Sequence, residues 1–139
     1  MQVLKFGGSS VANAGNINKV IAIVKRALSN DRTVVVSSAI SGATDSLLLI
    51  GNTAKSGDEK YLGLIDSLEQ RHIEIIDELI PAEESESIRQ TCQDLFNKLR
   101  EICKGVFLLK ELTDLSQDHM VSFGELLSTN IISAILKSL

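Results

Sequence analysis

The first 37 residues alternate strand-like and helix-like patterns, and this order restricts the possible folds more than any other feature of the chain. Gln2–Phe6 and Thr33–Ser37 have the composition of buried strands, and the second is a continuous β-branched run typical of parallel strands covered on both faces. Asn16 can cap the helix predicted between them. The apolar residues of that helix recur at helical spacing: Ile17, Val20, Ile21, Val24, Ala27 and Leu28. Two strands joined by one helix form a right-handed βαβ unit, so the sequence predicts an α/β fold with a parallel start.

The middle of the chain predicts two antiparallel helices on either side of Pro81. Apolar positions follow alternating spacings of four and three residues, the pattern of a heptad-like seam. The first run comprises Tyr61, Ile65, Leu68, His72, Ile75 and Leu79, and the second comprises Ile88, Cys92, Leu95, Leu99, Ile102 and Val106. We expect a helical hairpin subdomain over residues 58–106, with a seam that the preceding helix can share. His72 is expected to be a core histidine with satisfied polar atoms. Cys92 and Cys103 are expected to be core thiols, too far apart for a disulfide.

Composition excludes some functional classes. The 139 residues carry a net charge of −4, with 44% hydrophobic and 23% charged residues, as in an ordinary globular domain. No basic patch is evident, so a nucleic-acid partner is not expected. No apolar run approaches the roughly 20 residues of a membrane span, and no secretory signal is visible, so we expect no membrane partner and a cytoplasmic location.

The end of the chain suggests that the fold extends further. An apolar stripe with i, i+4 steps runs to Leu139 with no Gly or Asn cap after it. Only two strands are evident, fewer than a stable sheet needs. We therefore expect residues 1–139 to be the front part of a larger domain. Two strands with open edges also favour self-association, so a homo-oligomer is expected.

A cluster of glycines and hydroxyls directly follows the first strand, in the segment Lys5-Phe6-Gly7-Gly8-Ser9-Ser10-Val11. The glycines let the backbone approach an anion without interference from a Cβ. Successive backbone N–H groups in such a turn form an anion-binding concavity, and the lysine adds a full positive charge. The pattern differs from a P-loop and from the G-x-G-x-x-G dinucleotide motif, so it predicts a phosphate site of another kind.

Two further clusters can carry chemistry. The segment from Ser38 to Asp45 follows the second strand, and either Thr44 or Asp45 can cap a helix beginning near Ser46. Ligands bind at the carboxyl ends of parallel strands, so this loop and the first cluster should line one crevice. The third cluster, Ser122-Phe123-Gly124-Glu125-Leu126-Leu127-Ser128, is expected to open the final helix.

Together, the three clusters resemble the motifs of the aspartokinase family within the amino-acid kinase superfamily, in the family's order and at compatible separations. The helical hairpin also fits, and the resemblance extends over essentially the whole chain. It implies the N-terminal portion of a three-layer α/β/α catalytic domain, from an aspartokinase or a bifunctional aspartokinase/homoserine dehydrogenase. The implied reaction is ATP-dependent phosphorylation of the β-carboxylate of L-aspartate, at the start of lysine, threonine and methionine biosynthesis, with Mg²⁺ accompanying ATP.

The resemblance also assigns roles on the phosphate side of the reaction. Lys5 would be the catalytic cation that lies across the phosphate oxygens and balances developing charge. Backbone amides of Gly7 and Gly8 would hold the γ-phosphate, with Ser9 and Ser10 as additional donors. No metal ligand is expected among these residues.

On the substrate side, the resemblance implies that Ser38 and Thr44 hydrogen-bond the aspartate and that Glu125 pairs with its α-ammonium. Ser41 and Ser128 are expected to be loop and helix-packing residues. In this family, the glycine-rich nucleotide-binding stretch and the residue that grips the α-carboxylate lie further along the chain, so residues 1–139 alone are expected to be inactive.

Two alternatives stay open. One is another kinase of the same superfamily, acting on glutamate, acetylglutamate, a nucleoside monophosphate or carbamate, although the loop from Ser38 to Asp45 and Glu125 suit an amino acid with a free α-ammonium. The other is a non-catalytic helical interaction module whose seam residues bind a partner, a hypothesis that leaves the three clusters unexplained.

Overall fold

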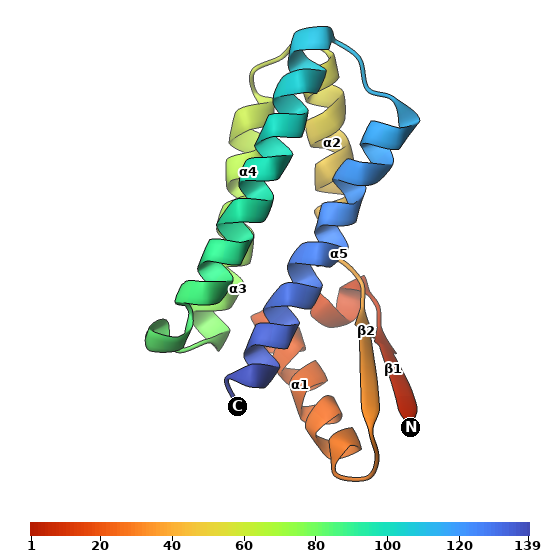
Figure 1. Ribbon diagram of the computed structural model, residues 1–139, viewed down its shortest axis with the longest axis vertical. Helices are drawn as coiled ribbons and strands as arrows, with labels where there is room; N and C mark the ends of the chain where they lie inside the picture. The colour runs from red at the N-terminus through yellow and green to blue at the C-terminus, as the bar shows by residue number, and fades with distance from the viewer.

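A computed structural model describes all residues from Met1 to Leu139 and contains two parts (Figure 1). A parallel βαβ unit lies at one end, and a bundle of four long helices extends from it. The elements in chain order are β1 (Gln2–Phe6), the 3₁₀ helix η1 (Gly8–Val11), α1 (Ala14–Leu28), β2 (Thr33–Ser37), α2 (Ala43–Lys55), α3 (Tyr61–Leu79), the 3₁₀ helix η2 (Ala82–Glu84), α4 (Glu86–Leu109) and α5 (Asp114–Lys137).

Strands β1 and β2 pair in parallel from Gln2 opposite Thr33 to Phe6 opposite Ser37, as the sequence predicted. Their burial alternates along the chain, because α1 and α5 pack only on the face that carries Leu4 and Val35. The other face is open, with Val3, Val34 and Val36 exposed by 60%, 46% and 44%. The expectation of strands covered on both faces is therefore wrong for this chain.

Helix α1 begins earlier than predicted. Its N-cap is Asn13, whose side chain accepts a hydrogen bond from the backbone N–H of Asn16 at 2.9 Å. The earlier start lets Ala14 enter the core. Asn16 lies within the first turn, and its side-chain amide donates to the carbonyl of Ser9 at 3.0 Å. Asn16 thus ties the helix to the loop after β1 rather than capping it.

Helix α2 also begins before the predicted position. Its first residue is Ala43, three before Ser46, and Gly42 stands at the N-cap with a left-handed φ of 82°. This conformation favours glycine, and it turns the chain sharply from the loop into the helix. Thr44 and Asp45 lie in the first turn, so neither caps α2.

Helix α5 begins at Asp114, with the Thr113 side chain accepting from the N–H of Ser116 at 3.1 Å. The third cluster, residues 122–128, consequently lies in the middle of this helix. The expectation that it opens the helix is wrong, because the residue that caps the helix, Thr113, lies nine residues before Ser122.

The four helices share one core. α3 and α4 pack against each other, and both also contact α2, while α5 packs against α2 and α4. The predicted seam of α3 is buried except at Leu79, but on α4 Phe96 and Cys103 are fully buried in place of Leu95 and Ile102. Since α4 has three helical neighbours, its buried face is wider than a two-helix seam.

Arg100 links α4 to α3 through ion pairs with Asp66 at 2.8 Å and Glu69 at 3.1 Å.

The two cysteines are core thiols, as expected. Cys92 and Cys103 are both free and fully buried in α4. Burial raises the pKa of each thiol to about 12, so neither is a reactive thiolate at neutral pH.

Helix α5 is long and apolar enough, by length and composition alone, to cross a membrane. Its position in the bundle accounts for this composition, because its apolar residues pack against α2, α4 and β2. The buried members are Met120, Phe123, Leu127, Ile131, Ile132 and Ile135.

His72 is completely buried in α3, but its polar atoms are only half satisfied. Its Nδ1 lies 2.7 Å from the carbonyl oxygen of Leu68, whereas its Nε2 has no hydrogen-bond partner. The ring packs edge-on against Phe96, with the centroids 5.5 Å apart. The expectation of a satisfied histidine is thus wrong at Nε2. Burial lowers the pKa of His72 to about 4, since the charged form would lose its hydration.

We expect acid to destabilise the fold through His72. Its pKa rises from about 4 in the folded chain to the ordinary 6.5 on unfolding, so the unfolded state binds more protons between these values. Stability is therefore lost as pH falls from 6.5 toward 4, by up to about 3 kcal/mol from this group. Urea denaturation of wild-type and His72→Leu chains across this range measures the difference. Equal pH dependence in the two chains would contradict the assignment.

Candidate active site

The loops after β1 and β2 lie against each other. The N–H of Ser38 donates to the carbonyl of Phe6 at 2.9 Å. A Cβ placed on Gly8 would lie 3.4 Å from the carbonyl oxygen of Ala39 and 3.8 Å from the Cα of Ser41. The two carboxyl-end loops are therefore neighbours, as the sequence predicted for parallel strands.

The first loop presents backbone and charge at the end of the sheet. Gly7 is extended, with φ −77° and ψ 174°, and leads into η1, where the N–H of Ser10 donates to the Gly7 carbonyl at 3.0 Å. Nothing lies within 4 Å of a Cβ placed on Gly7, so this backbone is open to a ligand. Lys5 is exposed on the uncovered face of the sheet, on the same side as Val3.

Ser9 and Ser10 border a different surface. They line a groove of about 350 Å³ between β1 and α1, together with Asn16 and Lys19. No hydrogen bond or ion pair joins the Lys5 side chain to the other candidate residues. The first cluster therefore presents Lys5 toward the open sheet face and its hydroxyls toward α1.

The third cluster reaches the second loop through two contacts from α5. A Cβ on Gly124 would lie only 2.8 Å from the Cβ of Ala39, closer than two carbon atoms can pack, so the helix can approach this far only at a glycine. One turn further on, the Ser128 hydroxyl donates to the Ser38 carbonyl at 2.6 Å. Glu125 directly follows Gly124 and is exposed. All three clusters are thus joined by direct contacts.

Sequence reasoning missed Arg71, which braces the same loops from α3. Its Nη2 donates to the carbonyl of Ala12 at 3.0 Å, and its Nη1 lies 3.6 Å from where a Cβ on Gly42 would stand. Arg71 therefore touches the segments that follow both strands. Nothing in the local sequence indicates this contact, because its partners lie 59 and 29 residues earlier.

The donors assembled here suit an anion better than a metal ion. Lys5 carries a positive charge. The exposed glycine N–H groups and the serine and threonine hydroxyls can donate hydrogen bonds to the oxygen atoms of an anion. No group of three or more His, Cys, Asp or Glu side chains is placed to hold a metal ion.

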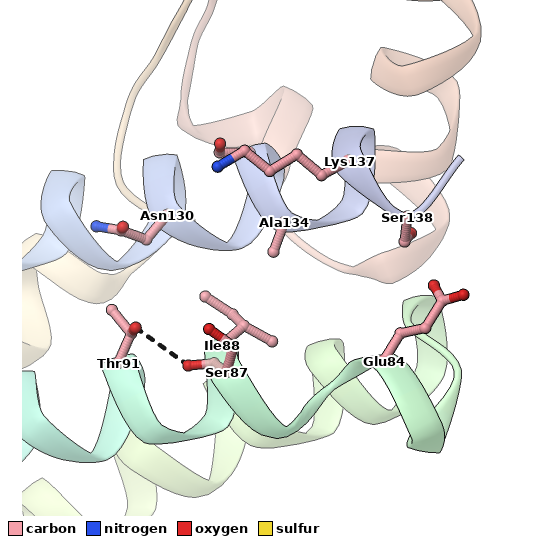
Figure 2. Close-up of a pocket in the computed structure, with 9 residues that line it drawn as sticks. Glu84, Ser87, Ile88, Thr91, Asn130, Ala134, Lys137 and Ser138 are labelled. Carbon is pink, nitrogen blue, oxygen red and sulfur yellow. Dashed lines mark hydrogen bonds between the residues drawn. The ribbon is translucent and has the colours of Figure 1, made fainter.

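Another polar groove lies elsewhere in the molecule, between the start of α4 and the end of α5 (Figure 2). It has a volume of about 370 Å³, and Glu84 and Lys137 are its charged members. Figure 2 shows these two side chains on opposite sides of the groove and the hydrogen bond from Thr91 to Ser87. None of its nine residues belongs to the three clusters, so it is separate from the candidate site.

The fold and site define an α/β protein in which an open, glycine-containing loop after β1 lies beside a second loop that α3 and α5 hold in place. The model of the amino acid kinase family matches residues 1–139, and the chain belongs to this family. The α/β fold of the amino-acid kinase type, predicted from the sequence, is confirmed over residues 1–139. The resemblance to aspartokinases is confirmed as well.

Named relatives support this assignment. The chain is 36% identical to aspartokinase 3, chloroplastic, and 34% identical to aspartokinase 1, chloroplastic, both of Arabidopsis thaliana. These matches cover 99% of this chain but only 24% and 23% of the relatives. The crystal structure of E. coli aspartokinase III in complex with aspartate and ADP (R-state) superposes with a TM-score of 0.82 at 27% identity, over 99% of this chain and 29% of that one. The chain thus spans about a quarter of the length of the proteins it matches.

The Gly124–Ala39 contact predicts opposite effects for two alanine substitutions. Gly124→Ala should destabilise the chain by about 1 kcal/mol or more, because overpacking against Ala39 outweighs the gain in helix propensity. Gly63→Ala is the matched control, since Gly63 is also helical but nothing lies within 4 Å of its Cβ position. It should stabilise the chain by up to about 1 kcal/mol. Thermal denaturation measures both, and equal stabilisation by the two would refute the contact.

Proposed function

We propose that this chain forms the aspartate-binding surface and part of the phosphate-binding surface of an aspartate kinase. The reaction transfers the γ-phosphoryl group of ATP to the β-carboxylate of L-aspartate, giving 4-phospho-L-aspartate and ADP, the first step toward lysine, threonine and methionine. The observation that carries the proposal is the contact of all three clusters at the carboxyl end of the sheet. It is supported by relatives named aspartokinases and by a similar structure described as a complex with aspartate and ADP.

Lys5 and the residues of the first loop would bind the phosphate groups of ATP. Phosphoryl transfer depends on positioning and on neutralising charge over the transferred group, more than on covalent chemistry by the protein. Lys5 supplies the positive charge, and the open backbone of Gly7 and Gly8 supplies N–H donors toward phosphate oxygens. Ser9 and Ser10 are proposed as further donors, although their groove lies on the α1 side. Mg²⁺ bound to ATP would neutralise phosphate charge, and no carboxylate lies among these groups to hold the metal.

The substrate side follows from the second loop and α5. Ser38 and Thr44 offer hydroxyls for hydrogen bonds to aspartate, and the Glu125 carboxylate offers a partner for its α-ammonium. All three side chains are at least partly exposed and therefore accessible to a ligand. The attacking β-carboxylate is already ionised at neutral pH, so the reaction needs no general base from the protein.

The alternatives receive less support. The named relatives are aspartokinases, alone or fused to homoserine dehydrogenase, which favours aspartate over glutamate or acetylglutamate. A helical interaction module would need a free seam, but the seam residues are largely buried inside the bundle. The cytoplasmic location remains a prediction from the sequence, and several relatives are named as chloroplastic.

We also propose that the 139-residue chain, when expressed alone, self-associates through the open face of the sheet, where Val3, Val34 and Val36 are exposed. Sedimentation of the 139-residue chain over a concentration series should show dimers or larger species, and Val34→Lys should shift them toward monomer. Leu62→Lys is the control, because Leu62 is similarly exposed, at 45%, but lies on α3. A monomeric wild-type chain at every concentration would rule this out.

The proposed activity can be tested in the natural polypeptide that carries this chain, expressed whole. It should phosphorylate L-aspartate, and the 139-residue chain alone should show negligible turnover because it spans about a quarter of its relatives. Lys5→Ala should lower kcat by about 100-fold or more. Glu125→Gln should instead raise the KM for aspartate about tenfold or more, through loss of a charged hydrogen bond.

Controls keep this test specific. Lys25→Ala and Glu111→Gln remove the same charges from exposed positions outside the three clusters and should change neither constant. Phosphorylation of glutamate in place of aspartate would overturn the substrate assignment. Comparable turnover by the isolated chain and the whole polypeptide would show that residues 1–139 suffice.

A further inference from the structure

Ser128 makes a long-range hydrogen bond that an ordinary helix serine does not make. Its hydroxyl lies 2.6 Å from the carbonyl oxygen of Ser38, 90 residues earlier, and 3.3 Å from the carbonyl oxygen of Glu125 in its own helix. A hydroxyl has one proton to donate, and the shorter distance favours the bond to Ser38. Ser128 is only 2% exposed, so water cannot readily replace this donor.

Gly124 makes the bond geometrically possible. It stands four residues before Ser128, on the same face of α5, and lets the helix come within contact of Ala39. Ala39 is itself buried and directly follows Ser38. The backbone of residues 38–39 is therefore held against α5 at two points, one of close packing and one of hydrogen bonding.

Glu125 lies between these two points on the same helix. Fixing the backbone of residue 38 to α5 therefore also fixes the separation between Ser38 and Glu125. These are two of the groups that the proposed function assigns to the substrate, one from the loop and one from the helix. A substrate that both must contact at once depends on that separation.

We propose that Ser128 is a positioning residue for aspartate binding, which acts by holding the Ser38 carbonyl and so setting the distance from Ser38 to Glu125. The proposal rests on the proposed function, because it concerns the same site. Ser128 itself touches no substrate. Its loss should affect aspartate more than ATP, since the first loop contacts the second through the Ser38 N–H bond to Phe6 and through Gly8, and neither contact involves α5.

The test compares Ser128→Ala with Thr129→Val in the natural polypeptide that carries this chain, expressed whole. Thr129 is the matched control, because its hydroxyl also donates to a carbonyl, at 2.7 Å, but the acceptor is Glu125 in its own helix. Ser128→Ala should raise the KM for aspartate about tenfold, since small displacements of positioning groups have large kinetic effects. The KM for ATP should stay within about twofold, and Thr129→Val should change neither constant.

Hydrogen exchange gives a readout that needs no substrate. Amide exchange over residues 38–42 should become faster in Ser128→Ala and stay unchanged in Thr129→Val. A Ser128→Ala protein with an unchanged KM for aspartate overturns the positioning role. So does one in which all constants and the Tm change together, or one that fails to fold, because Ser128 is then a packing residue. If the unmodified polypeptide phosphorylates no aspartate, the proposed function has failed, and the positioning role fails with it.

Discussion

The close approach of α5 to the loop after β2 is the contact on which the rest of the molecule depends. It joins the two parts of the molecule, the parallel βαβ unit and the four-helix bundle. Gly124 allows the backbone of the helix to reach Ala39, and Ser128 anchors the loop by hydrogen bonding. Without this contact, the second loop would be attached to the bundle mainly through the start of α2 and through Arg71.

The same contact shows how the helical bundle supports the loop after β2. Substrate-binding loops are positioned most accurately when rigid elements hold them on several sides. The β2–α2 loop is held by β1 through the Phe6 carbonyl, by α5 through Ser128, and by α3 through Arg71 near Gly42. The bundle thus serves the loop as a frame, and its buried interior is largely apolar, with His72 as the main polar exception.

Strands and helices were predicted well from the sequence where the composition or the spacing of apolar residues indicates them. Both strands follow from their composition, the helical character of α1, α3, α4 and α5 follows from apolar spacing, and the three clusters carry the resemblance to the family. Helix starts were predicted less well, because Asn13 and Asn16 are equally good capping residues by type, while the burial of Ala14 and the bond of Asn16 to Ser9 arise only in the fold. The burial of Phe96 and Cys103 was missed because α4 packs against α2 and α5 as well as α3, and its buried face is therefore wider than a two-helix seam. Arg71 and the Ser128–Ser38 bond could not be found, since both depend on residues far apart in sequence and close only in the fold.

The 90-residue separation of Ser38 and Ser128 has a consequence for how the protein forms at the ribosome. The βαβ unit lies within the first 37 residues and can assemble early, from contacts that are nearby along the chain. The loop that follows it must wait until α5 has been synthesised and has left the exit tunnel, because only then does its backbone find the serine that anchors it. The loop after β2 is thus anchored only after the βαβ unit and the first three helices of the bundle have been translated.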